Sequence, residues 1–84
     1  MAGQGQDDAS PAAGRARERV IHAKRRELAS HKRAVVLHKQ AAELQQRLGH
    51  KEEAEAALKR AAHAQELYDM ALAELAEWGL PASS

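Results

Sequence analysis

Residues 51–78 read KEEAEAALKRAAHAQELYDMALAELAEW, and the apolar positions of this stretch decide the fold. From Ala54 to Trp78, small or apolar residues recur at alternating steps of three and four. That spacing places them on one stripe of an α-helix. Because most of them are alanine, the stripe predicts a seam that a second helix approaches closely. Its members are Ala54, Ala57, Ala61, Ala64, Tyr68, Ala71, Leu75 and Trp78.

The rest of the chain predicts a second long helix and a short connection. We expect the first helix over about 11–48, a turn at 49–50 and the second helix over about 51–78. Gly49 and Gly79 each follow a helical run, where glycine adopts the left-handed conformation that closes a helix. A turn this short makes the helices antiparallel neighbours, so the predicted fold is an all-α helical hairpin.

The hairpin is expected to span 11–79, with a disordered tail at 1–10 and a frayed end at 80–84. The chain has 84 residues, of which 20 are alanine, and Tyr68 and Trp78 are its only aromatic residues. Each buried alanine removes little apolar area from water, and a hairpin of this size buries only a small hydrophobic core. We therefore expect a second chain to contribute to stability.

The first helix carries two apolar stripes, and one neighbouring helix covers only one of them. The stripes are Ile21, Leu28, Val35, Ala42 and Ala34, Leu37, Ala41, Leu44, Leu48. We predict a homodimer that forms an antiparallel four-helix bundle. The residues expected to line the packing and dimer seams are Ile21, Leu28, Val35, Leu37, Leu44, Ala61, Ala64, Tyr68, Leu75 and Trp78.

Charge is distributed unevenly along a chain whose net charge is only +1. Residues 15–39 hold nine basic and two acidic residues, whereas 50–78 hold three basic and seven acidic ones. Pairing between the antiparallel helices is the preferred interpretation, and a nucleic-acid contact on the first helix is the alternative. The residues of that alternative are Arg15, Arg17, Arg19, Lys24, Arg25, Arg26, Lys32 and Arg33.

Two histidines and a glutamate fall between the apolar stripes of the first helix. Glu27, His31 and His38 are therefore expected to turn inward, and a dimer would double them, which suggests a metal site. His31 and His38 are about 10 Å apart along the helix, too far to share one ion unless chains interleave. The preferred interpretation is structural packing, with hydrogen bonds from the rings. Protonation of these rings near pH 6 offers a pH-switch alternative.

Several functional classes find no support in the sequence. The chain has no cysteine, which excludes disulfides and thiolate chemistry, and no apolar run of about 20 residues that would span a bilayer. It offers neither a convincing nucleophile nor a glycine-rich phosphate loop. We expect a cytoplasmic protein that is not an enzyme, needs no cofactor and does not insert into membranes.

Residues 35–68 resemble a single tetratricopeptide-repeat hairpin. The resemblance lies in the turn and second helix, LGHKEEA at 48–54 followed by Leu58 and Ala61, and in Ala42 as the small residue of the first helix. Both helices run beyond repeat length, and the chain has no second copy. The resemblance implies helix packing and a protein-interaction role, and no functional residue is carried over from it.

The sequence therefore predicts a small interaction module that works through helix packing. The preferred hypothesis is self-association together with binding of a protein partner. The sequence does not identify that partner. Nucleic-acid binding by the basic face of the first helix is the alternative, and a metal-binding bundle is the third hypothesis.

Overall fold

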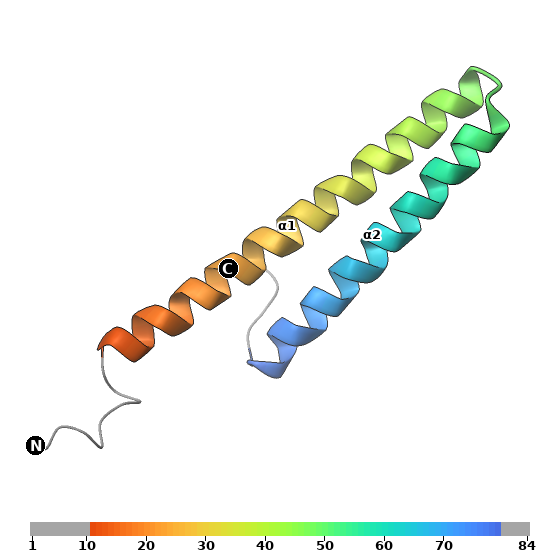
Figure 1. Cartoon of the computed structure of the whole chain (residues 1–84). Helices are drawn as coiled ribbons and strands as arrows, with labels where there is room; N and C mark the ends of the chain where they lie inside the picture. The colour runs from red at the N-terminus through yellow and green to blue at the C-terminus, as the bar shows by residue number, and fades with distance from the viewer. Residues whose placement is uncertain (1–10, 80–84) are drawn as a thin grey trace, which may run out of the picture.

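The computed structural model describes residues 11–79, which form two long helices packed side by side in a hairpin (Figure 1). Helix α1 spans Pro11–Arg47 and helix α2 spans Lys51–Glu77. No strand occurs within these residues, so the predicted all-α antiparallel hairpin is confirmed. The expected tail at 1–10 and frayed end at 80–84 lie outside the described residues.

The turn between the helices has the geometry of a Schellman motif. Gly49 has φ +79°, which glycine adopts without the steric penalty that a Cβ brings. The amide of His50 donates to the carbonyl of Gln45 at 2.8 Å, and the amide of Gly49 donates to the carbonyl of Gln46 at 3.1 Å. These bonds satisfy carbonyls that the end of α1 would otherwise leave unpaired. The chain thus reverses within three residues and holds the helices antiparallel.

The seam between the helices is built mostly of alanine on the α2 side and of larger residues on the α1 side. On α1, Leu28, Val35 and Ala42 recur every seven residues and are buried. On α2, six of the eight residues of the predicted stripe are buried: Ala54, Ala57, Ala61, Ala64, Ala71 and Leu75. The small residues bring the backbones close together, and this contact is the packed core of the hairpin.

Larger side chains gather at the end of the seam away from the turn. Leu28, Ala71 and Leu75 form a buried cluster there, and Tyr68 and Leu72 pack against it half-buried. Leu75, at 2% exposure, is the largest fully buried side chain within residues 12–79. This cluster contributes more apolar burial than the alanine part of the seam, so it is the main hydrophobic anchor.

Helix α1 is longer than α2 and projects beyond it. α1 has 37 residues and α2 has 27, and Figure 1 shows the first turns of α1 continuing past the end of α2. Residues 12–20 are all exposed. At 1.5 Å per residue they form a single helix about 14 Å long with no neighbouring helix among the described residues. Neither α1 nor α2 has the length and hydropathy required to cross a membrane.

Candidate functional site

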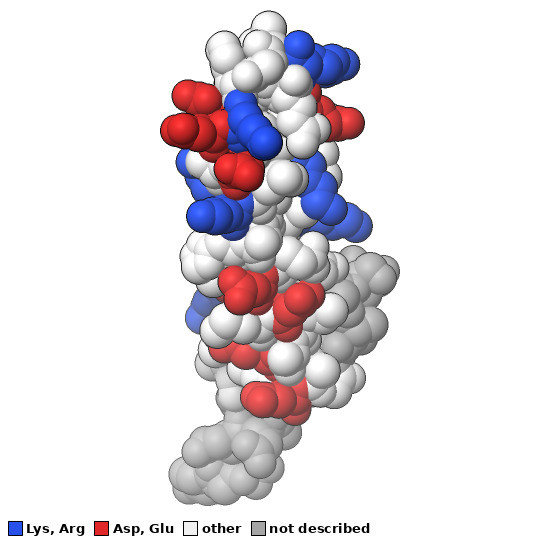
Figure 2. Space-filling view, turned by 90° about the vertical axis from the view of Figure 1, so that its right-hand side faces the viewer, with Lys and Arg blue, Asp and Glu red and all other residues white. Residues whose placement is uncertain are grey.

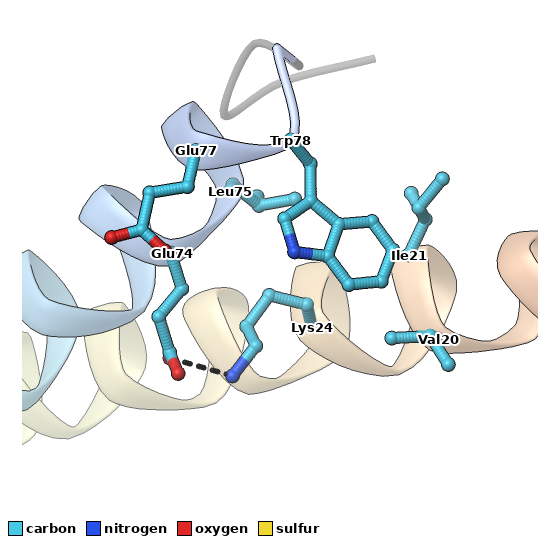
Figure 3. A pocket seen from close by; sticks show the side chains of 7 residues that line it. All are labelled: Val20, Ile21, Lys24, Glu74, Leu75, Glu77 and Trp78. Carbon is cyan, nitrogen blue, oxygen red and sulfur yellow. Dashed lines mark hydrogen bonds and ion pairs between the residues drawn. The ribbon is translucent and has the colours of Figure 1, made fainter.

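A small pocket of about 260 Å³ lies where α2 ends against α1 (Figure 3). The Lys24 ammonium donates to Glu74 on α2 at 2.7 Å and to Glu27 on its own helix at 3.1 Å. These two hydrogen bonds, the one to Glu74 above all, raise the pKa of Lys24 above its usual value. Trp78 covers the apolar side of the pocket, and the guanidinium of Arg17 lies 6.0 Å from its ring centroid. The Lys24–Glu74 ion pair and the Trp78 ring hold the C-terminal end of α2 against α1.

The residues proposed as metal ligands are only partly brought together. Glu27 and His31 lie 3.3 Å apart, and hydrogen bonds from Lys24 and then from His31 lower the pKa of Glu27. Glu27 was expected to turn inward, but its side chain is 44% exposed because it lies at the edge of the seam. Within residues 11–79, no group of three or more histidine, cysteine or acidic side chains could hold a metal ion.

A shallow groove of about 460 Å³ runs between the helices nearer the turn. His31 and His38 of α1 line it together with His63, Lys59 and Arg60 of α2. His63 lies on α2, and the antiparallel register brings it beside the histidines of α1. Lys59 and Arg60 are cationic, and a histidine becomes cationic when it is protonated. The lining includes no carboxylate that would help to hold a cation.

The C-terminal half of α1 exposes an apolar surface on the side away from α2. We call this surface the leucine face, and it consists of Leu37, Ala41, Leu44 and Leu48. Leu37, Leu44 and Leu48 are exposed large hydrophobic residues, with Leu44 at 49%. These leucines belong to the second apolar stripe, so α2 leaves that stripe uncovered within the chain.

The other residues that the sequence predicts in the seams differ in how deeply they are buried. Leu28, Val35, Ala61, Ala64 and Leu75 are buried between the helices. Ile21 and Tyr68 are half-buried, and Trp78 is exposed at the end of α2.

The N-terminal half of α1 carries a row of cations on the same outer side. At 100° per residue, the four residues of this arginine stripe fall within an arc of about 40°. The stripe consists of Arg15, Arg19, Arg26 and Arg33, and all four are exposed. His22 lies close to the same line and is also exposed. The outer side of α1 thus divides into a cationic half and an apolar half.

Pairing between the two oppositely charged segments is much less extensive than expected. Among residues 11–79, the only cross-helix ion pair joins Lys24 to Glu74. The other acidic side chains of α2 are exposed, and Figure 2 shows acidic side chains on the α2 side both near the turn and farther along the hairpin. The arginine stripe is on the opposite side of the hairpin, so these charges do not meet.

The other basic residues named for nucleic-acid binding lie off the stripe. Arg17 lies against Trp78, and Lys24 is engaged by two carboxylates. Arg25 is half-buried, and its Nε atom is buried without a hydrogen-bond partner. Lys32 is exposed on the flank of α1, between the stripe and the seam.

Comparison with protein families, curated proteins and solved structures finds no match to this chain. The resemblance of residues 35–68 to a tetratricopeptide hairpin is therefore supported only by the residues quoted above.

Proposed function

We propose that this protein is a non-enzymatic protein-interaction module that pairs with a second copy of itself through the leucine face. The observation that carries the proposal is the 3-4 spaced row of half-exposed leucines on the side of α1 that α2 does not cover. Heptad-like spacing of this kind is typical of a seam between helices. A cytoplasmic location and the absence of catalysis belong to the same proposal.

The charge of α1 favours an antiparallel arrangement of the two copies. A parallel pairing of two α1 helices would align one arginine stripe with the other, and like charges facing each other oppose association. An antiparallel pairing centred on the leucine face sends the two stripes to opposite ends of the dimer. It also brings Arg33 of one copy near the start of α2 in the other, where Glu52 and Glu53 are exposed.

The contribution of one leucine to this dimer follows from its exposure. Complete burial of a leucine is worth about 1.5–3 kcal/mol, so burying the exposed half of Leu44 contributes about 1 kcal/mol. Leu44→Ala removes this contribution from both copies, about 2 kcal/mol per dimer. The expected result is a dimer dissociation constant about 30-fold higher.

Sedimentation equilibrium over a range of concentrations measures this constant directly. The matched control is Leu58→Ala, because Leu58 lies on α2 outside the leucine face and is 46% exposed. The control should associate like the original chain. A chain that stays monomeric at all concentrations contradicts the proposal, and equal weakening by the two variants contradicts the choice of face.

A further inference from the structure

We infer that the arginine stripe binds the phosphate backbone of duplex DNA. This inference goes beyond self-association, because three of the four stripe arginines lie in the N-terminal half of α1, away from the leucine face. It rests on three properties of the stripe and its surroundings: charge without an ion pair among residues 11–79, a helix end that projects past α2, and small side chains beside Arg15.

The four arginines form a dense and unneutralised line of charge. From Arg15 to Arg33 the stripe extends about 27 Å along the helix. No ion pair involves these arginines within residues 11–79. Glu27 projects from another side of α1, and Glu18, three residues after Arg15, forms no ion pair with it. A row of like charges without counterions in the protein is relieved by a polyanion, and binding gains from the counterions that the nucleic acid releases.

The projecting end of α1 gives the stripe access to a groove. Residues 12–20 form a single exposed helix, and Ala12 and Ala16 add little bulk beside Arg15. An α-helix is about 10–12 Å wide with its side chains, and the major groove of B-form DNA is about 12 Å wide. The deep and narrow major groove of A-form RNA does not admit a helix in this way. Duplex DNA therefore fits the projecting helix better than duplex RNA does.

Other anionic partners match this surface less well. Single strands are usually held by several exposed aromatic side chains, but Tyr68 is half-buried on the seam, and the exposed Trp78 is the only other aromatic residue of the chain. Anionic membranes are usually bound by helices with bulky apolar anchors beside the cations. Ala23, Ala29 and Ser30 beside the arginine stripe are small. The bulky apolar residues Val36 and Leu37 lie only at its Arg33 end.

Fluorescence anisotropy with a short labelled DNA duplex of mixed sequence tests this inference at two salt concentrations. Four phosphate contacts predict a slope of about −3.6 for the logarithm of the binding constant against the logarithm of salt concentration. Between about 50 mM and 200 mM salt the affinity should fall about 150-fold. The triple variant Arg15→Gln, Arg19→Gln, Arg26→Gln keeps one stripe arginine, so its slope should be about −0.9.

The matched control removes three cations elsewhere: Lys51→Gln, Lys59→Gln, Arg60→Gln. Both triple variants lower the net charge by three, so a difference between them reports position and not total charge. A second stripe variant with Arg15→Lys, Arg19→Lys and Arg26→Lys retains the charges and should keep the steep slope. Circular dichroism of each variant checks that the helices are intact.

Three results would overturn the inference. The first is no binding of the original chain to the duplex at low salt. The second is an equal loss of slope in the stripe variant and in the α2 control variant. The third is tighter binding to duplex RNA, to single-stranded DNA or to anionic lipid vesicles than to duplex DNA under the same conditions. None of these results depends on whether the chain dimerises.

Discussion

Substitution of Ala61 by tryptophan tests the close-packed seam most directly. Ala61 is 3% exposed, and its neighbours along the stripe, Ala57 and Ala64, are buried as well. An indole ring at this position has no free space, because small residues on α2 let the backbone of α1 approach closely. The helices must separate locally or the ring must adopt a strained rotamer.

The loss of stability expected for Ala61→Trp follows from this geometry. Overpacking a well-packed core costs about 1–3 kcal/mol, and an aromatic ring in place of a methyl group belongs at the upper end. In a domain of this size, each kcal/mol lowers the melting temperature by about 4–8 °C. We therefore expect Ala61→Trp to melt about 12–24 °C lower than the original chain.

The control is Ala62→Trp, one residue along the same helix on an exposed position. It has nearly the same effect on helix propensity but leaves the seam untouched, so its melting temperature should change by no more than about 4 °C. Thermal melts followed by circular dichroism, at one protein concentration, measure both variants. Equal melting temperatures for the two variants would refute the seam as described.

Three further substitutions probe the anchor, the turn and the surface charges. Leu75→Ala should lower the free energy of unfolding by about 2–4 kcal/mol in urea titrations, because it leaves a cavity beside Leu28. Gly49→Ala should lower it by about 1 kcal/mol in the same assay, since φ is +79° there. The lowered pKa of Glu27 means that its hydrogen bond from Lys24 stabilises the fold above pH 4.5 and ceases to do so as the pH falls below that value. Glu27→Gln should therefore lower stability at pH 6, by no more than about 0.5 kcal/mol, and the difference should shrink in thermal melts as the pH falls below 4.5.

The hairpin could be predicted from the sequence because each of its determinants is local. The 3-4 spacing from Ala54 onward identifies the buried face of α2, and it needs only the helical period of 3.6 residues. Gly49 and Gly79 both have positive φ, as expected for residues that close helices. The single short turn then leaves no other topology for two long helices.

The arrangement of charge could not be obtained from segment totals. The totals for residues 15–39 and 50–78 have opposite signs, but they do not record the direction in which each side chain projects. The acidic residues of α2 and the arginine stripe point to opposite sides of the hairpin, so only Lys24 reaches Glu74. Similarly, His63 joins the groove of His31 and His38 through the register between helices, which is a tertiary property.

The two proposals together give a reason for the greater length of α1. The apolar half lies beside the turn, where α2 supports it and where its leucines are free to meet a second copy. The cationic half includes the projecting end, where a second helix would obstruct a groove-sized ligand. About 16 Å of helix separates Leu37 from Arg26, the nearest arginine changed in the triple glutamine variant, and substitutions at such distances act independently. Loss of the leucine face should therefore change the mass in solution without changing the salt slope, and the triple glutamine variant should do the reverse.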